Sequence, residues 1–259
     1  MNFPSSGPHK KTLSAEASLE QLIHERAADV LIAVASDPRL TEDLALALLN
    51  RRDLPREALE EMNRNGSVSK LRKVRLAIVM HPRAPRHVSV PVIRHLYAFE
   101  LMQVGLFPAV PADVKRAAEE TLIGRLATIS SGERYALAKQ GSGRVAAALL
   151  LDKEERTMQA ALTNPQMTEA HIVKALRAEQ ETELLLAVLC RHEKWSRRND
   201  IKAALLANEN TPLARALQFA GELPVKVLKE VLVNSRLSEN VKSYLLAAIE
   251  ERKQRKVFP

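Results

Sequence analysis

Met80-His81-Pro82-Arg83-Ala84-Pro85-Arg86-His87-Val88 is the stretch that decides the fold of this chain of 259 residues. A second copy, Leu106-Phe107-Pro108-Ala109-Val110-Pro111-Ala112-Asp113-Val114, has both prolines and the last valine at the same places. Looser copies occupy residues 36–41, 163–168 and 233–238, and copies with shifted spacing occupy residues 50–55 and 208–212. The stretch is therefore a recurring motif.

Each copy of the motif predicts the end of one helix, a short turn and the start of the next. The apolar run before it ends in most copies at Asn, Asp or His, which tolerate the backbone conformations that close a helix. A following proline disfavours helix in the residue before it. Four residues after the stop residue comes a helix-starting residue. These are the N-cap types Thr41, Thr168 and Ser238, and Pro85, Pro111 and Pro212, which we expect at the first helical position.

The spacing of the stop residues predicts how the helices are organised. From His81 to Phe107 is 26 residues, and from Asn164 to His192 is 28 residues. Units of about 30 residues with one or two helices each are typical of stacked helical repeats. We therefore predict an all-α fold, a right-handed α-solenoid of short antiparallel helix pairs; an irregular helical domain with common capping residues is the alternative.

The expected repeat domain covers residues 15–250, between a disordered tail at 1–14 and a polar tail at 251–259. The loop at 63–69 is a candidate hinge within it. We expect helices over 68–79 and over 88–101, the second with Pro91 in its first turn, because an isolated strand at 88–92 would not be stable.

Composition indicates a cytoplasmic protein. Cys190 is the single cysteine, so no intramolecular disulfide forms. The first residues lack the apolar segment of a signal peptide, and the longest obvious apolar run, 145–151, is too short to cross a bilayer. We expect no integral membrane association. Because aromatic residues make up only 3% of the chain, the core must be aliphatic.

Several segments resemble an uncharacterised group of bacterial helical-repeat proteins. They are Ser131-Gly132-Glu133-Arg134, Gly143-Arg144-Val145-Ala146-Ala147, Ala160-Ala161-Leu162-Thr163-Asn164-Pro165 and Asn210-Thr211-Pro212-Leu213-Ala214. Over roughly residues 25–250 the chain is also similar to HEAT and leucine-rich-repeat-variant solenoids. The resemblance implies a binding scaffold and supplies no catalytic residue.

Positive charge is concentrated in one segment. Between Met62 and Phe99 there is no Asp or Glu, and the formal charge of the whole chain is +8. The basic residues of this segment are Arg64, Lys70, Arg72, Lys73, Arg75, Arg83, Arg86 and Arg94. If the last seven share a face, they form an anion-attracting surface for nucleic acid, an acidic protein or an anionic membrane. A solvated repeat surface with one basic region is the alternative.

Three functions are consistent with this pattern. The first is a scaffold without enzymatic activity that binds a macromolecule, most simply a protein, through its concave or basic surface. The second is binding to the duplex nucleic-acid backbone through residues 62–99, which needs Lys and Arg but few aromatic residues. The third, a HEAT-like DNA glycosylase, requires aromatic residues around an acid, a cluster that the sequence does not identify.

No other motif predicts a cofactor or a catalytic site. Cys190 and His192 offer two soft ligands, whereas zinc requires three or four, so we predict no metal site. Trp195, the single tryptophan, lies between Lys194 and Arg197. It is either an exposed anchor for a partner or a packing residue at a repeat junction.

Overall fold

The computed structural model describes residues 18–178, 183–235 and 237–247, and within these residues every regular element is a helix. The prediction of an all-α fold is confirmed. The predicted tails at 1–14 and 251–259 lie outside the described residues. No helix in the described part of the chain combines the length and apolar character needed to cross a bilayer.

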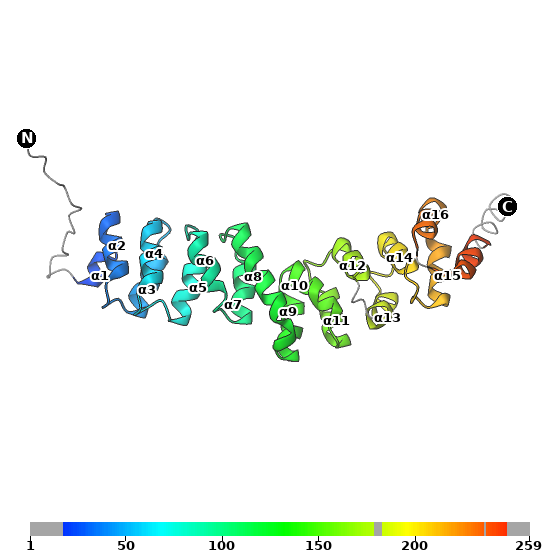
Figure 1. Ribbon diagram of the computed structural model, residues 1–259, viewed down its shortest axis with the longest axis horizontal. Coiled ribbons are helices and arrows are strands. Elements are labelled where there is room, and N and C mark those ends of the chain that lie inside the picture. The colour runs from blue at the N-terminus through cyan, green and yellow to red at the C-terminus, as the bar shows by residue number, and fades with distance from the viewer. Residues whose placement is uncertain (1–17, 179–182, 236, 248–259) are drawn as a thin grey trace, which may run out of the picture. The chain divides into compact units, whose positions relative to one another are not determined.

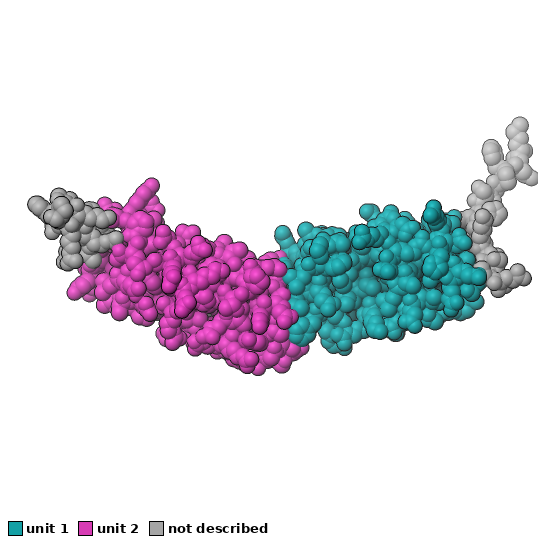
Figure 2. Space-filling model, turned by 180° about the vertical axis from the view of Figure 1, so that it is seen from behind, with its two compact units in different colours: residues 1–122 teal, residues 123–259 magenta. Residues whose placement is uncertain are grey.

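The chain divides into two compact units, residues 1–122 and residues 123–259 (Figure 2). Unit 1 contains α1 (Leu19–Leu22), α2 (Ala28–Ser36), α3 (Glu42–Leu49), α4 (Arg56–Arg64), α5 (Arg72–Met80), α6 (Arg86–Ile93), α7 (Ala98–Leu106) and most of α8 (Ala112–Arg125). Unit 2 contains η1 (Leu126–Thr128), α9 (Ser131–Gln140), α10 (Gly143–Ala148), η2 (Leu149–Leu151), α11 (Glu155–Leu162), α12 (Glu169–Leu176), α13 (Glu183–Arg191), α14 (Asn199–Leu206), α15 (Leu213–Glu222) and α16 (Val225–Asn234), and residues 239–247 are also helical.

Within each unit the helices stand in two rows (Figure 1). In unit 1, α2, α4 and α6 contact one another in sequence and form an even row, while α3, α5 and α7 form an odd row. In unit 2, the even row is α10, α12, α14 and α16, and the odd row is α9, α11 and α13. The helices of a row therefore pack against the helix two positions away in the chain, and several, such as α5 and α6, also pack against the next helix.

Aliphatic side chains fill the space between the rows, as the low aromatic content predicts. In unit 1 the fully enclosed residues include Leu48, Leu59 and Ile78, which come from three different helices. In unit 2 a cluster around Leu206, Leu223 and Leu228 joins α14 to α16. Such burial is worth about 2 kcal/mol per aliphatic side chain, and it holds helices that are too short to be stable alone.

Two motif residues, His81 and Asn164, and Asn65, which ends α4, bind neighbouring turns through their side chains. In unit 1 the Asn65 side-chain amide donates to the carbonyl oxygens of Ala35 at 3.0 Å and Asp37 at 2.9 Å. In unit 2 the amide of Asn164 donates to those of Ala138 and Gly141, both at 2.9 Å. The side-chain oxygen of each asparagine accepts from the backbone N–H two residues later, at 3.0 Å and 2.7 Å. Each asparagine thus closes its own turn and ties it to the turn two helices earlier.

His81 also closes its own turn and ties it to an earlier turn, through its imidazole ring. Its Nε2 donates to the Arg51 carbonyl at 2.9 Å, and its Nδ1 accepts from the Arg83 N–H at 3.1 Å. The bonds from Asn65, Asn164 and His81 to the neighbouring turns span 23 to 30 residues, close to the spacing of the stop residues in the sequence. The neutral imidazole with its proton on Nε2 satisfies both bonds.

Unit 1 is expected to lose stability as the pH falls below about 6.5, the ordinary pKa of histidine. Burial lowers the pKa of His81, with a further lowering from the Arg83 charge. The unfolded chain therefore takes up a proton before the folded chain does, so this contribution is complete above pH 6.5 and is lost as the pH falls through the folded pKa. Urea unfolding followed by circular dichroism should show a stability that declines as the pH falls below about 6.5.

The matched variant is His81→Asn, because asparagine can make both hydrogen bonds, as Asn65 and Asn164 do, without titrating. It should flatten the pH dependence of unit 1 over that range. An unchanged pH dependence in His81→Asn would show that His81 is not its source.

Three local predictions need correction. The helix expected over 88–101 is broken into α6 and α7, and α6 carries Pro91 in its interior rather than in its first turn. The break is stabilised by Glu100, whose carboxylate accepts from the Tyr97 N–H at 2.8 Å and so starts α7. The helix expected from residue 68 begins at Arg72. Pro85 and Pro212 stand at the N-cap, one residue before the position expected.

The two threonine caps are confirmed, because the hydroxyls of Thr41 and Thr168 accept from backbone amides in the first turns of α3 and α12. The candidate hinge at 63–69 lies inside unit 1. There Asn65 and the hydroxyl of Ser67, which donates to the Pro38 carbonyl at 2.8 Å, bind the loop to the preceding turn.

Candidate binding surfaces

Seven of the eight basic residues of the 62–99 segment lie at two ends of the helix pair α5 and α6, and the eighth, Arg64, ends α4. Lys70, Arg72, Lys73 and Arg75 surround the start of α5, and Arg94 directly follows the end of α6. Arg83 and Arg86 stand at the opposite end, in and just after the turn that joins the two helices. The pair is antiparallel and α5 is about 13 Å long, so the seven residues form two groups rather than one patch.

Carboxylates from outside the segment pair with several of these cations. Arg72 donates from Nε to Glu100 of α7, and Arg86 lies 3.5 Å from Asp113 of α8. Arg64 lies 2.6 Å from Glu61. Glu61 and Glu100, at the two borders of the segment without acids, thus neutralise part of its positive charge.

Two further arginines hold loops in place. Arg75 donates from Nε to the Ser69 carbonyl at 3.0 Å. Arg83 donates from Nη1 to the Asp53 carbonyl at 2.9 Å. These bonds to neutral carbonyl groups do not compensate the guanidinium charges. Replacing either arginine would therefore disturb the backbone as well as the surface potential.

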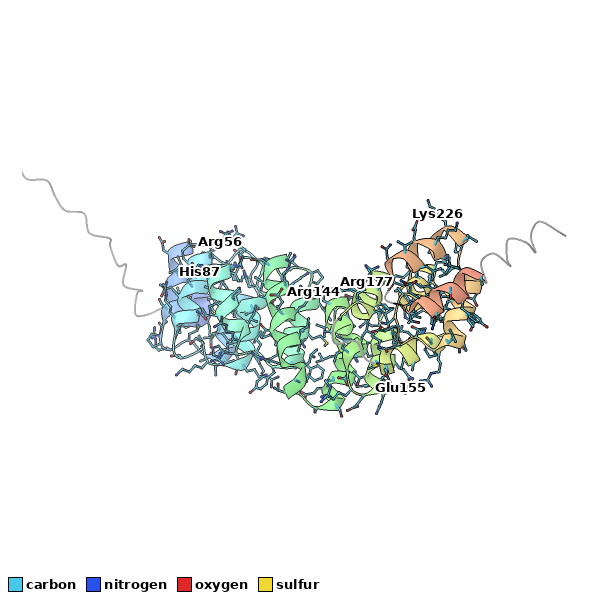
Figure 3. The ribbon with its side chains drawn as sticks, turned by 45° about the vertical axis from the view of Figure 1, so that its right-hand side comes forward. Arg56, His87, Arg144, Glu155, Arg177 and Lys226 are labelled. Atoms are coloured by element: carbon cyan, nitrogen blue, oxygen red, sulfur yellow. The ribbon has the colours of Figure 1, made fainter. Side chains whose placement is uncertain are left out.

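Figure 3 shows His87 and Arg56 on the same side of unit 1, near the starts of α6 and α4. His87 Nε2 lies 3.1 Å from Oε1 of Glu60. The even row of unit 1 therefore presents mixed charge, with basic and acidic residues interleaved.

An exposed apolar stripe runs along α7. Tyr97 is 63% exposed, Phe99 38% and Phe107 39%. Phe99, Met102 and Leu106 follow the helical spacing of one face, and Leu101 and Val104 on the other side are fully buried. This helix therefore has two apolar faces, one of them turned away from the core.

The stripe continues over the neighbouring helices of the odd row. Leu76 and Met80 of α5 and Leu46 of α3 are half-buried, and Ala47 of α3 is exposed. Since α3 contacts α5, α5 contacts α7 and helical spacing turns these side chains away from the fully buried positions, we infer that they form one surface. We call it the odd-row face of unit 1: Leu46, Ala47, Leu76, Met80, Phe99, Met102 and Leu106.

Cationic residues border this face where α5 begins. The guanidinium of Arg72 lies 4.5 Å from the centre of the Tyr97 ring and is paired with Glu100, and its side chain remains 65% exposed. Lys73 is exposed in the same helical turn. Aromatic, methionine and arginine side chains are the types enriched where proteins bind one another.

A groove of about 990 Å³ crosses the even row of unit 2. Its walls come from α12 and α16, and α14 lies between them. The part of α14 that lines the groove carries Asp200 in its first turn and then the small side chains of Ala203 and Ala204, followed by Ala207 directly after the helix; all three alanines are half-buried. In Figure 3, Arg177 and Lys226, at the ends of α12 and α16, lie on the side of unit 2 opposite to Glu155.

Trp195 is a packing residue, and the hypothesis of an exposed anchor is wrong. Only 3% of the residue is exposed, and its indole N–H donates to the Leu162 carbonyl at 2.8 Å. That bond spans 33 residues, so Trp195, like Asn65 and Asn164, links its own turn to an earlier one. The ammonium of Lys194 covers the ring at 4.1 Å.

Two features of these surfaces are not among the predictions made from the sequence. The first is the second apolar face of α7, which the spacing of Phe99, Met102 and Leu106 could have revealed. The second is the run of alanines on α14, which a helical pattern cannot distinguish from ordinary core packing. Among the described residues, no group of three or more His, Cys, Asp and Glu side chains is placed to hold a metal ion.

Comparison with known proteins yields no match to a family model, to a curated protein or to a solved structure.

Proposed function

We propose that this protein is a scaffold without enzymatic activity, which binds a partner protein through the odd-row face of unit 1. The proposal includes a HEAT-like, right-handed α-solenoid architecture and a cytoplasmic location. The two rows of helices and the turn-to-turn bonds support the architecture. The lone, buried Cys190 is in keeping with a reducing compartment.

The observation that carries the proposal is the exposed apolar stripe of α7. Three of the aromatic side chains in a chain with few of them stand in or next to one helix and face away from the core. Exposed apolar surface is costly unless another surface covers it, and contiguous patches rimmed by polar groups mark sites of protein association. The Arg72 and Lys73 rim favours a partner whose apolar contact is bordered by acidic residues.

The double variant Tyr97→Ser/Phe99→Asp should lose partner binding by about tenfold or more, because it removes both aromatic anchors. The fold should be preserved. Serine at the N-cap of α7 and aspartate in its first turn are each worth about 1 kcal/mol or less, which offsets the lost Arg72–Tyr97 contact of similar size. Affinity capture from an extract of the source cells, followed by titration with the purified captured protein, measures the change.

The matched control is Leu213→Asp/Tyr244→Ser, which likewise replaces a large apolar residue by Asp and a tyrosine by Ser, at residues that are 53% and 69% exposed in unit 2. It should bind the partner like the unaltered protein. If both variants bind equally well, the odd-row face is not the site, and if capture requires nucleic acid and disappears after nuclease treatment, the partner is not a protein.

Nucleic-acid binding remains the second candidate because one observation favours it. The Arg72 guanidinium and the Tyr97 ring form an exposed stack, and Lys70 and Lys73 are exposed near it. Rings and cations together are what single-stranded nucleic acid requires. The pairing of Arg64, Arg72 and Arg86 with carboxylates weakens the duplex version of the hypothesis, because those cations are already partly compensated.

Fluorescence anisotropy with random duplex and single-stranded DNA tests this candidate. If the protein binds nucleic acid, the measured affinity should be micromolar and should fall steeply as the salt concentration rises. The double variant Lys70→Glu/Lys73→Glu should not bind. These lysines are better targets than Arg72 and Arg75, whose side chains also hold neighbouring elements. Binding that survives the double reversal would place the site elsewhere.

The glycosylase hypothesis gains nothing from the groove of unit 2, whose lining contains acids but no aromatic side chain. A groove lined by alanine and valine offers no stack for an extruded base.

A further inference from the structure

The groove of unit 2 is apolar at its base and acidic at its edges. Half-buried valines of its two walls, Val173 of α12 and Val227 and Val231 of α16, face the alanines of α14 across it. Four carboxylates also line it, from Glu169, Asp200, Glu209 and Glu230, against one cation, Arg177. The lining thus has a formal charge of −3 in a chain whose charge is +8.

Among the residues that the structure describes, one of these four carboxylates has a cation beside it. Glu169 lies 3.4 Å from Arg198. In the part of the chain that the structure describes, Asp200, Glu209 and Glu230 have no ion-pair partner. Acidic groups beside a shallow apolar surface attract a positively charged ligand and orient it.

The base of the groove favours a helix over an extended peptide. It is formed by the sides of helices, whose backbone groups are already bonded within each helix. An extended peptide laid there would leave its own N–H and C=O groups largely without partners, whereas a helix satisfies them itself. Neighbouring helices lie about 9–10 Å apart, so a helix of about 13 residues would cross from α12 to α16.

We propose that the groove formed by α12, α14 and α16 binds a basic amphipathic helix of another protein. Its apolar side packs on the alanines of α14, and its lysines and arginines pair with Asp200, Glu209 and Glu230. This inference concerns unit 2 and stands independently of the odd-row face of unit 1.

A selection experiment tests the proposal without knowledge of the natural partner. A phage-displayed library of helical peptides of about 14 residues, randomised on all faces, is panned against the immobilised full-length protein. We expect the enriched peptides to carry several lysines or arginines beside an apolar stripe. The enriched peptide, synthesised with a fluorescent label, then serves as the probe for variants.

Glu209→Lys/Glu230→Lys should weaken binding of that peptide about tenfold or more, because it replaces two attractive contacts with repulsive ones. The matched control is Glu57→Lys/Glu193→Lys, at exposed positions outside the groove, which changes the net charge of the protein by the same amount. The control should leave the affinity within about twofold, because charge alone, away from the groove, acts weakly across solvent.

Ala204→Trp separates docking in the groove from general attraction, since it fills the base and alters no charge. It should also weaken binding about tenfold, with an unchanged helical signal. Enrichment of neutral or acidic peptides, absence of enrichment, or equal binding by the groove variants and the control would each overturn the proposal.

Discussion

Replacing Asn164 by alanine should destabilise unit 2 by about 3 kcal/mol or more. The Asn164 residue is 2% exposed, and its side chain joins three backbone groups, the carbonyls of Ala138 and Gly141 and the N–H of Gln166. Alanine would leave these groups without that partner in a space that water cannot readily fill. Such a loss is a large fraction of the stability of a small unit.

Trp195 provides the measurement, because it is the single tryptophan and is buried in unit 2. Urea unfolding followed by its fluorescence should show a transition at much lower denaturant in Asn164→Ala. Asn164→Asp sharpens the test, because near neutral pH it turns a carboxylate toward two carbonyl oxygens and should be the worse variant. Acidification should partly restore it, since a protonated carboxyl can donate one hydrogen bond.

Asn50→Ala is the control, at an exposed asparagine that ends α3 in unit 1. It should cost less than about 0.5 kcal/mol. If Asn164→Ala were no more harmful than this, the turn-to-turn bonds would not be a significant source of stability.

Gly143→Ala should be comparably damaging, although alanine is the better helix former. A Cβ at this first residue of α10 would lie 2.6 Å from the Gln166 carbonyl oxygen and 2.8 Å from Cε1 of His171. The Gln166 backbone cannot easily withdraw, because its N–H is bonded to Asn164 and its side chain accepts from the Gly143 N–H at 3.2 Å. A loss of about 2–3 kcal/mol is expected, against a gain of about 1 kcal/mol in helix propensity.

Gly132→Ala is the matched control, since it also lies in the first turn of a unit 2 helix and a Cβ there would meet nothing within 4 Å. This variant should be neutral or slightly stabilising. A stable Gly143→Ala protein would mean that the turn at 163–168 can shift away from α10 at little cost.

The all-α fold was predictable because it rests on local signals. His81, Asn164 and Thr168 are recognisable as stop and start residues from their types and from the prolines next to them. Their side-chain bonds to other turns were not predictable, because a bond across 23 to 30 residues depends on how helices stack. The break between α6 and α7 likewise depends on Glu100, whose carboxylate acts on a backbone N–H that the pattern does not reveal.

The candidate binding surfaces were harder to predict for a related reason. The absence of acids from residues 62–99 is a property of the sequence, whereas the potential at a surface depends on every charge that lies nearby in space. Glu61 and Glu100 lie just outside the segment and pair with Arg64 and Arg72. The exposed face of α7 cannot be predicted from the pattern, because an apolar pattern identifies helix faces without saying which of two such faces meets the core.

The enclosed asparagines also offer a way to time the opening of each unit. Their side-chain amide hydrogens can exchange with deuterated solvent only when the turn that holds them separates from its neighbour. Asn65 reports on unit 1 and Asn164 on unit 2. Both signals can be followed in one nitrogen-edited NMR spectrum. Equal exchange rates with the same denaturant dependence would indicate that one cooperative event opens both units, whereas different rates would give each unit its own lifetime.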